Sequence, residues 1–215
     1  MSGTSTERRR RALPRTFYDR PTELVARDLL GVVLECTTPD GTASGRIVEV
    51  EAYLGPDDPA CHAVAGRTQR TWHLHGPPGV AYVYFIYGVH WCFNAVTREE
   101  GHGSAVLVRA LEPLTGVDLM CRRRGPVRRD VDLTNGPGKL CAALGIDGAL
   151  DGVRLDRRPL RILAADRVSD SDVLVTPRIG ITRAADWPLR WVIRGNPYVS
   201  TARPGVARPR QRTRR

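Results

Sequence analysis

The sequence predicts a single mixed α/β domain of the α+β type, with a mostly antiparallel β-sheet flanked by helices and a protruding β-hairpin. Short apolar and β-branched segments recur along the chain and end at turns rich in Gly and Pro, and few helical segments separate them. The chain contains neither a repeated βαβ unit nor a Gly-rich dinucleotide-binding loop. Its 215 residues suit one domain with a substantial core.

One helix and two hairpins are predicted in the first half of the chain. Thr22 is a suitable N-cap for a helix over residues 23–30, and Gly31 is a suitable stop. The strands expected in this half cover residues 32–37, 43–53, 80–86 and 89–97. A Pro39-Asp40-Gly41 turn joins the first two strands, and a Tyr87-Gly88 turn joins the last two.

The second half continues the pattern with one long strand and two short helices. The strand covers residues 104–111, and Pro113 is expected to end it because proline cannot donate to a strand ladder. The helices are expected over residues 117–124 and 138–144, and Gly145 stops the second. The remaining strand candidates cover residues 160–164, 173–176 and 189–194.

The chain is strongly basic, with a net charge of +10 and a pI of about 10.1, which favours a polyanionic partner. Arginines gather near both ends, so residues 1–12 and 203–215 are predicted to be disordered tails around a folded domain over 13–202. No apolar run follows the N-terminal arginines, and none approaches the ~20 residues of a membrane helix. We therefore expect a protein that is neither secreted nor bound to a membrane.

The five cysteines show no C-x-x-C spacing and are odd in number, which argues against a disulfide framework and a zinc site. The H-x-E and P-C-x-x-C signature of zinc deaminases is also absent. We expect buried thiols in a reducing compartment. The cysteines are Cys36, Cys61, Cys92, Cys121 and Cys141.

Glu49 and Glu51 lie two residues apart in an apolar strand and therefore share one face. Because two like charges on a buried face are unfavourable, this face should be open or line a site. Three interpretations are open. The pair lies on the solvent face of an edge strand; or it joins Asp57 and Asp58 in the metal site of a nuclease; or a carboxylate beside Tyr53 serves an aromatic slot.

The hairpin around Tyr87-Gly88 is rich in aromatic residues. Because side chains alternate along a strand, one face of the first strand carries Tyr82, Tyr84 and Ile86. On the return strand, one face is the polar set His90, Cys92 and Asn94, whose groups can hydrogen-bond or stack on a base, and the opposite face is apolar. Tyr87 at the turn has little core to reach, so it either packs on a neighbour or inserts between base steps.

Two further residues are candidates for the same site. His62 lies in a loop over residues 54–66, expected to contain one helical turn, and can return to Glu51. Lys139, the single lysine of the chain, follows Asn135-Gly-Pro-Gly138 at a helix start, where backbone amides and a cation suit a phosphate.

In these residues the chain resembles the alkyladenine (3-methylpurine) DNA glycosylases. The matching segments keep the family's order and cover most of the chain from about Leu13 to Ser200. They are Leu29-Leu-Gly31, Arg46-Ile-Val-Glu-Val-Glu-Ala-Tyr-Leu-Gly55, His62, Pro78-Gly79, Tyr82-Val-Tyr-Phe-Ile-Tyr-Gly88, Asn94, Val106-Leu-Val-Arg-Ala-Leu-Glu-Pro113, Gly136-Pro-Gly-Lys-Leu-Cys141, Arg178-Ile-Gly180 and Arg194-Gly-Asn-Pro197.

The resemblance implies a curved antiparallel sheet, no metal or other cofactor, and a monomer that acts on double-stranded DNA containing damaged purines. The implied enzyme is a monofunctional DNA glycosylase of the EC 3.2.2 class. It flips an alkylated or deaminated purine out of the duplex and hydrolyses the N-glycosidic bond with an activated water, which initiates base excision repair. The scarcity of lysine agrees with water rather than an amine as the nucleophile.

The resemblance also implies individual roles. Glu51 would be the general base for the water that attacks C1′, and Arg109 and the backbone carbonyl of Ile179 would help to hold that water. The residues that line the base pocket would be Tyr53, His62, Tyr84 and Asn94, of which the last rejects the exocyclic amine of guanine. Tyr87 would fill the gap in the duplex. The residues implied at the DNA backbone are Gly138, Lys139 and Arg178.

One segment departs from the family's pattern. Where the family shows an Arg-Asn pair and a Met-Phe pair, this chain has Arg70-Thr-Trp-His-Leu-His75, so the local wall of the pocket and the range of lesions are left open. Two alternatives to a glycosylase also remain at this point: a metal-dependent nuclease, and a non-catalytic DNA-binding module. If the organism is a bacterium, we expect the protein in the cytoplasm in association with the nucleoid. If it is a eukaryote, we expect the protein in the nucleus.

Overall fold

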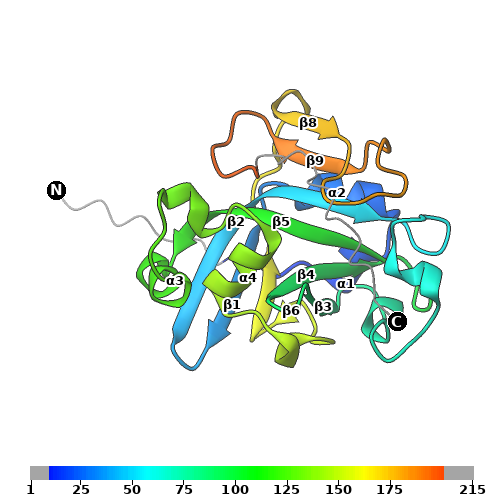
Figure 1. The fold of residues 1–215 in the computed structure, drawn as a ribbon, viewed down its shortest axis with the longest axis horizontal. Helices are drawn as coiled ribbons and strands as arrows, with labels where there is room; N and C mark the ends of the chain where they lie inside the picture. The colour runs from blue at the N-terminus through cyan, green and yellow to red at the C-terminus, as the bar shows by residue number, and fades with distance from the viewer. Residues whose placement is uncertain (1–9, 201–215) are drawn as a thin grey trace, which may run out of the picture.

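The computed structural model describes residues 10–200. Within these residues nine strands form one curved sheet, and every strand pairing is antiparallel (Figure 1). The main path runs β3-β4-β5-β2-β1-β7-β6, while β9 pairs with β2 and β8 pairs with β9. The strands are β1 (Val33–Thr38), β2 (Gly41–Tyr53), β3 (Ala81–Ile86), β4 (His90–Thr97), β5 (Ser104–Thr115), β6 (Asp156–Arg157), β7 (Leu160–Leu163), β8 (Val173–Thr176) and β9 (Arg190–Ile193).

Helices are few and short in the described part of the chain. The α-helices are α1 (Arg15–Tyr18), α2 (Thr22–Leu29), α3 (Val117–Arg124) and α4 (Pro137–Leu144). The 3₁₀ turns are η1 (His62–Ala65), η2 (His73–His75), η3 (Asp130–Leu133), η4 (Gly148–Leu150) and η5 (Asp170–Asp172). No helix among residues 10–200 is long and apolar enough to cross a membrane.

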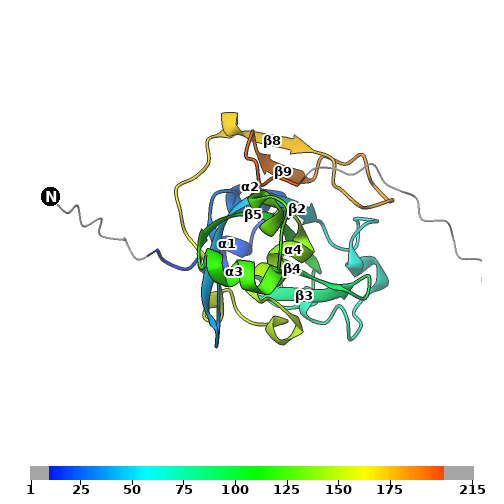
Figure 2. The same cartoon turned by 60° about the vertical axis from the view of Figure 1, so that its left-hand side comes forward.

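Strand β2 is the centre of the sheet because it pairs with three other strands. Its first half pairs with β1 as far as Arg46, and its second half pairs with β9 from Glu49 to Glu51. Along its other edge β2 pairs with β5, and the register shifts on both sides of Glu49. Such bulges bend a strand and increase its twist. The region around Glu49 is therefore where the sheet curves and where three strands meet. Figure 2 shows β8 and β9 above β2 and β5.

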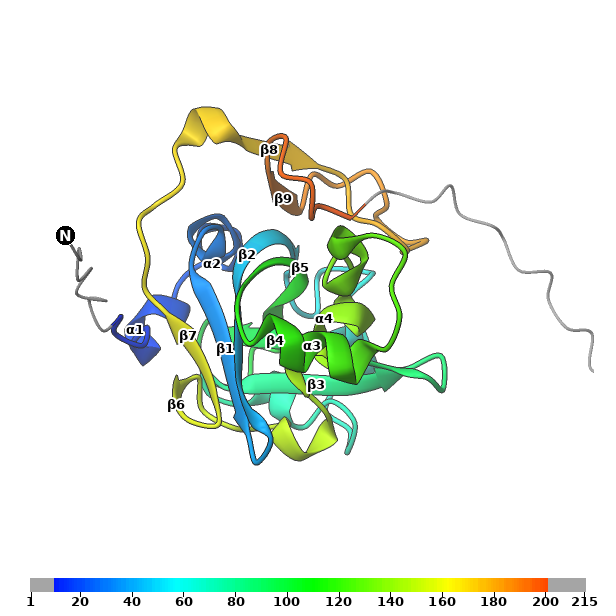
Figure 3. The same ribbon diagram turned by 90° about the vertical axis from the view of Figure 1, so that its left-hand side faces the viewer.

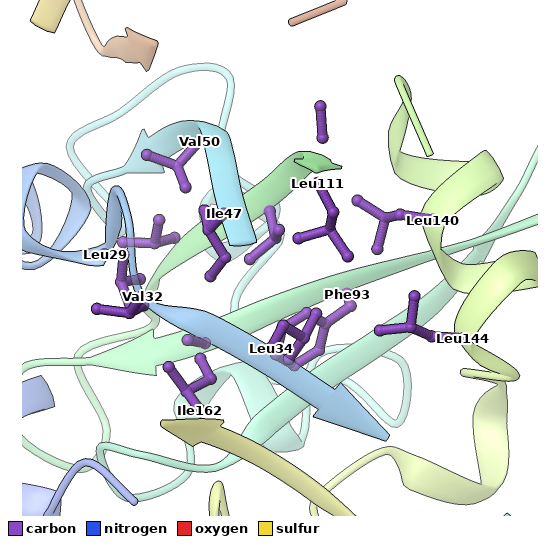
Figure 4. Packing of buried hydrophobic residues seen from close by; sticks show 14 of the residues in the cluster. Leu29, Val32, Leu34, Ile47, Val50, Phe93, Leu111, Leu140, Leu144 and Ile162 are labelled. Carbon is purple, nitrogen blue, oxygen red and sulfur yellow. The ribbon is translucent and has the colours of Figure 1, made fainter. Parts of the chain in front are cut away.

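The hydrophobic core lies between the curved sheet and the helices. Side chains from α2, β1, β2, β4, β5, β7 and α4 converge there, including Leu29, Leu34, Phe93, Leu111 and Leu144 (Figure 4). Helix α4 packs against β4 and β5, α3 packs against α4, and α2 packs against β2. Figure 3 shows α3 and α4 together beside β4 and β5, with α2 next to the upper part of β2 and above β1.

The β3–β4 hairpin extends past this core, and its tip projects from the body of the domain (Figure 3). Tyr87 and Gly88 have φ values of 56° and 70°, and the amide of Val89 donates to the carbonyl of Ile86 at 3.3 Å. Two successive positive φ values suit a two-residue turn of the type that matches strand twist. The Tyr87 side chain is 76% exposed, so it does not pack into the domain.

The structure confirms the predicted fold class and both hairpins, but it corrects two local predictions. Thr22 is not an N-cap: the helix begins at Thr22, Pro21 precedes it, and the Thr22 hydroxyl lies 3.0 Å from that of Thr97. Pro113 does not end a strand, because β5 continues to Thr115. A register shift in the pairing of β2 with β5 occurs at this point, and a shift of this kind accommodates a residue without an N–H.

Three further predictions concern the cysteines and the chain ends. All five cysteines are free thiols, and four are buried as expected, but Cys121 is exposed. The predicted N-terminal tail over residues 1–12 is too long, since Ala12 forms an antiparallel bridge to Leu163 and Leu13 donates to the carbonyl of Ile162. Residues 1–9 and the C-terminal tail over 203–215 lie outside the described residues.

Truncation of the core should be far more costly than truncation on the hairpin. Phe93 is fully buried, so Phe93→Ala should lower the free energy of unfolding by about 3–5 kcal/mol, measured by chemical denaturation. Phe85 is 44% exposed and contacts Trp91, so Phe85→Ala should cost only about 1 kcal/mol. Equal losses in the two variants would contradict this assignment of the core.

Candidate active site

A cavity of about 360 Å³ opens between the β3–β4 hairpin, the start of α4, the η1 loop and the segment after β8. Small-molecule sites have volumes of about 300–1,000 Å³, so the cavity is large enough for a purine base. The predicted site residues that line it are Tyr53, His62, Tyr84, Tyr87, Asn94, Arg109, Gly138 and Ile179. The structure thus brings together residues that are separated by more than a hundred positions in the sequence.

One wall of the cavity is a single face of the β3–β4 hairpin. The register pairs Tyr82 with Asn94, Tyr84 with Cys92 and Ile86 with His90. All six of these residues line the cavity. The predicted alternation along each strand is therefore confirmed. The aromatic face predicted for β3 and the polar face predicted for β4 lie on the same side of the hairpin. Phe93, which points to the other face, is in the core.

His62 returns to this wall from the η1 turn, as predicted. Its Nδ1 lies 2.9 Å from the Tyr82 hydroxyl, and its ring lies edge-on to Tyr84 with centroids 4.6 Å apart. Burial lowers the pKa of His62, and the nearby Arg70 guanidinium lowers this pKa further. Asn94 is fixed as well, because its Nδ2 donates to the carbonyl of Tyr82 at 3.0 Å. The polar groups of the cavity are therefore held in place before a ligand binds.

Glu51 lies directly behind the cavity, with no exposed surface. Its Oε2 accepts hydrogen bonds from Arg109 Nη1 at 3.1 Å and from the Tyr53 hydroxyl at 3.0 Å, and its Oε1 accepts one from the amide of Ile179 at 2.7 Å. All three donor residues line the cavity. The predicted catalytic residues Glu51, Arg109 and Ile179 therefore form one connected group, in which Ile179 takes part through its amide, whereas the expectation concerned its carbonyl.

Burial raises the pKa of Glu51 above the usual value for a glutamate, and the negative charge of Glu49 adds to this effect. Arg109, the Ile179 amide and the Tyr53 hydroxyl oppose it, because each stabilises the ionised carboxylate. Glu51 is therefore a desolvated carboxylate whose ionised form three donors stabilise, and carboxylates with a perturbed pKa of this kind are common in active sites.

Glu49 is also completely buried, which corrects the expectation that its face would be open to solvent or would line a site. It does not line the cavity. Its Oε1 accepts hydrogen bonds from Arg109 Nε at 3.0 Å and from Arg190 Nε at 2.7 Å. Two carboxylates are thus tolerated in the interior because two guanidinium groups accompany them.

Arg178 was expected at the DNA backbone, but its side chain is fully buried. Its Nη1 and Nη2 donate to Asp58 at 2.5 and 2.9 Å, Nη1 also donates to the carbonyl of Ala52, and the guanidinium lies 4.7 Å from the centre of the Tyr53 ring. The guanidinium therefore has no exposed surface for a phosphate. It supports Tyr53 from behind and fixes the backbone that presents the Ile179 amide.

The nuclease interpretation required Glu49, Glu51, Asp57 and Asp58 to converge on one metal ion. Arginines already occupy oxygens of three of these carboxylates, and Asp57 is exposed. Among residues 10–200 no group of three or more His, Cys, Asp or Glu side chains is arranged to hold a metal ion. The arrangement of the acidic residues therefore gives this interpretation no support.

The predicted phosphate contacts lie at the start of α4. Pro137 and Gly138 line the cavity, which places the N-terminus of α4 at its mouth. Lys139 follows but does not line the cavity; its Nζ donates to Asn135 Oδ1 at 2.7 Å and to Asp132 Oδ1 at 3.3 Å. Its side chain is 39% exposed, so the lysine can reach a phosphate at the surface but not a base in the pocket.

The segment 70–75 completes the cavity with different residues from those typical of the resembled family. Leu74 lines the cavity and is buried. Thr71 is buried, and its carbonyl accepts a hydrogen bond from His75 Nδ1 at 3.0 Å. Trp72 is 54% exposed and carries the Arg67 guanidinium 3.8 Å from its ring centre. The sequence did not determine the character of this wall, and the structure shows that it is apolar at Leu74.

Together, the fold and the site define a class of protein: an α+β enzyme with a strongly basic chain, in which a buried carboxylate lies behind a purine-sized pocket lined by aromatic side chains. Comparison with known proteins narrows the class. The model of the methylpurine-DNA glycosylase family matches residues 16–197. The chain belongs to the methylpurine-DNA glycosylase family, and it is a DNA glycosylase, an enzyme of the EC 3.2.2 class that hydrolyses N-glycosidic bonds.

Curated relatives agree with the family match over nearly their whole length. A Salinibacter ruber protein is 50% identical over 204 residues, which covers 89% of this chain and 98% of the relative. A Methanoculleus marisnigri protein is 50% identical over 191 residues, which covers 87% of this chain and 98% of the relative. A Burkholderia lata protein is 48% identical over 190 residues, which covers 87% of this chain and 90% of the relative. Each carries the name "Putative 3-methyladenine DNA glycosylase".

Several residues that hold the site in place were missed or misinterpreted from the sequence. Arg190 was placed only in a strand, Glu49 was given no arginine partner, and Asp58 was considered only as a metal ligand. One local signal was available for Asp58, because it lies two positions after Pro56 and its side chain accepts a hydrogen bond from the amide of Ala60, two residues further on, as a turn-forming aspartate does. No local signal indicated its pairing with Arg178.

Removing Asp58 should strongly destabilise the domain. Asp58→Asn leaves Arg178 buried without a counter-charge, so the free energy of unfolding at pH 7 should fall by about 3–5 kcal/mol. Burial alone raises the pKa of Asp58, but the hydrogen bonds from Arg178 and two amides outweigh it, and the net pKa lies below the usual aspartate value. The stabilisation is therefore present above the unfolded-state pKa, about 3.9, and is lost as the pH falls through the lower folded-state pKa.

Chemical denaturation at pH 7 and in acid tests this, and Asp170→Asn is the matched control. Asp170 also pairs with arginines, Arg27 and Arg167, but its side chain is 72% exposed, so its replacement should change stability little. A similar loss in both variants at pH 7 would argue against a structural role for the buried pair.

Proposed function

We propose that this enzyme removes alkylated purines from double-stranded DNA by taking the damaged nucleotide into the cavity and hydrolysing its N-glycosidic bond with a water molecule that Glu51 activates. The observation that carries the proposal is the contact set of Glu51, a buried carboxylate whose three hydrogen-bond donors all line the cavity. The relatives' names support an alkylated adenine as one substrate.

The hydrogen bonds of Glu51 leave room for one water. A carboxylate offers about four acceptor positions, two on each oxygen. Arg109 and Tyr53 use the two positions on Oε2, and the Ile179 amide uses one on Oε1. The remaining position is on Oε1, beside Ile179. A water bound there could give its proton to Glu51 as it attacks C1′, and the ionised carboxylate would stabilise the oxocarbenium-like transition state.

The pocket suits a leaving group that carries positive charge. Purines methylated at N3 or N7 are cations, and the faces of aromatic rings attract cations. Tyr53, Tyr84 and the neutral His62 ring provide such surfaces in the cavity. Such a base needs no proton before it departs, so no general acid is required for it. Alkylated purines are therefore the preferred substrate class, with hypoxanthine and etheno-adenine as further candidates.

Selection and access follow from residues at the edges of the pocket. Asn94 is held by the Tyr82 carbonyl and cannot turn away, so it would disfavour the exocyclic amine of a guanine. The positive charge of 7-methylguanine, which aromatic faces attract and which weakens its N-glycosidic bond, would offset this cost, whereas normal guanine has no such compensation. Tyr87 at the exposed hairpin tip would occupy the space that the flipped base leaves in the duplex. The N-terminus of α4 and Lys139 would contact a phosphate beside the flipped nucleotide.

Hydrolysis by water rather than by an amine is consistent with the position of Lys139. Its amine is bound to Asn135 and Asp132, and Lys139 does not line the cavity. A Schiff base at C1′ would require an amine in the pocket. We therefore expect an abasic product with an intact strand.

Base release from a duplex that contains one 3-methyladenine or 7-methylguanine tests the proposal. In the presence of chelator the wild type should produce an abasic site, and Glu51→Gln should slow single-turnover release by about 10²–10⁴-fold because the general base is lost. Binding of the same duplex should be nearly unchanged. Metal-dependent cleavage of the strand, or full activity in Glu51→Gln, would reject the proposal.

The pH dependence of release should report the ionisation of Glu51. Since burial raises its pKa, the rate should fall in acid at a higher pH than an ordinary glutamate would cause. Arg109→Gln removes the cation that opposes this shift, so the acid limb should move to still higher pH and the maximal rate should fall. A 7-methylguanine substrate is suitable because its methyl group fixes its charge in acid. An acid limb that does not move in Arg109→Gln would contradict the proposed pairing.

A further inference from the structure

We propose that Glu49 is a positioning residue that holds Arg109 end-on to Glu51, and that Ser200, near the C-terminal end of the chain, is part of the same support. The inference rests on the proposed function of Glu51. Glu49 does not line the cavity, so it would act only through Arg109. Its expected contribution is therefore to the orientation of the catalytic group and not to the binding of DNA.

Glu49 is surrounded by donors from three separate parts of the chain. Its Oε1 accepts hydrogen bonds from Arg109 Nε on β5 and Arg190 Nε on β9, and its Oε2 accepts one from the amide of Ser200 at 2.7 Å. The Ser200 hydroxyl adds a fourth bond, to Oε1 at 2.7 Å. The side chain has no exposed surface. A buried carboxylate with four donors has a fixed position, so it can serve as a rigid support for a partner.

Arg109 requires such a support because of the shape of its guanidinium. An isolated arginine tends to form two parallel hydrogen bonds with one carboxylate. Two such bonds to Glu51 would occupy the acceptor position on Oε1 that the attacking water needs. In the structure Nε is bound to Glu49 at 3.0 Å, and only Nη1 reaches Glu51, at 3.1 Å. Glu49 thus keeps the contact between Arg109 and Glu51 single, and one acceptor position on Glu51 Oε1 stays unoccupied by Arg109.

The backbone reinforces this geometry. The pairing of β2 with β5 shifts register on both sides of Glu49, and Arg109 has no Cα partner in β2. Bulged residues redirect their side chains relative to a regular ladder. Glu49 and Arg109 therefore meet at an irregularity that both strands share, next to the contact between β2 and β9.

Charge balance gives the inference a distinctive consequence. The group contains two carboxylates, Glu49 and Glu51, and two guanidinium groups, Arg109 and Arg190. Neutralising Glu49 leaves an excess of positive charge and frees Arg109 to approach Glu51 more fully. Both changes favour the ionised form of Glu51, so its titration should move to lower pH. The shift is opposite in direction to that expected for Arg109→Gln.

The experiment measures single-turnover release of 7-methylguanine from duplex DNA against pH for wild type, Glu49→Gln, Ser200→Ala and Glu35→Gln. Glu49→Gln should release base about 10–100-fold more slowly, bind the duplex as tightly as wild type, and show an acid limb at lower pH. Ser200→Ala keeps every charge and should lose rate about 2–10-fold. Glu35→Gln makes the same substitution at a glutamate on β1 that pairs with Arg161 away from the cavity, and should match wild type.

The outcomes separate this inference from the proposed function. A wild type that releases no methylated base overturns both. An active wild type with an unchanged Glu49→Gln rate, or a slower Glu49→Gln whose acid limb does not move, overturns the positioning role alone. If Glu49→Gln does not fold, as judged by its thermal unfolding, Ser200→Ala decides: a wild-type rate in that variant rejects the role, and a slower rate in a stably folded variant supports it.

Discussion

The structure depends on a constraint of electrostatics: two carboxylates lie side by side in the interior of a protein. Glu49 and Glu51 have no exposed surface, and an isolated buried carboxylate costs several kcal/mol of solvation. Arg109 and Arg190 supply the opposite charges, and hydrogen bonds from Tyr53, Ile179 and Ser200 satisfy the remaining oxygens. A neutral cluster of this kind is tolerated in a core, whereas any three of its four charged members would leave an unpaired charge.

The curvature of the sheet can be understood from this cluster. A regular β2–β5 ladder would not bring Glu49 and Arg109 together with their present geometry, and the register shifts occur where these residues lie. Strand β9 then pairs with the second half of β2 in place of β1, and it contributes Arg190. The buried pair of Asp58 and Arg178 repeats the arrangement on the far side of Tyr53. Glu51 is thus fully enclosed, and the residues that donate hydrogen bonds to it line the cavity.

The β3–β4 hairpin joins stability to function by using its two faces differently. Phe93 on one face is in the main core, while Tyr82, Tyr84 and Asn94 on the other face line the cavity. Its tip leaves the domain and exposes Tyr87. A strand pair that is anchored through one face can present a rigid second face to a ligand, because the core fixes the backbone. The loop residue His62 and the start of α4 complete the cavity against this fixed wall.

The sequence by itself determined the fold class, most of the strands and the faces of the hairpin, and its resemblance to a known family indicated most of the predicted residues around the cavity. These follow from alternation, turn residues and ordered motifs, which are properties of neighbouring residues. Only the tertiary structure decided which charges pair. Arg109, Arg178 and Arg190 meet their carboxylates across 58, 120 and 141 residues. The family resemblance placed Arg109 in the site, but no local pattern distinguished Arg190 from a surface arginine or indicated that Arg178 pairs with Asp58. Their burial, and with it the position of Arg178 behind Tyr53 rather than at the DNA, arises only when distant strands assemble, because the cost of desolvating a charge exists only once the surrounding core excludes water.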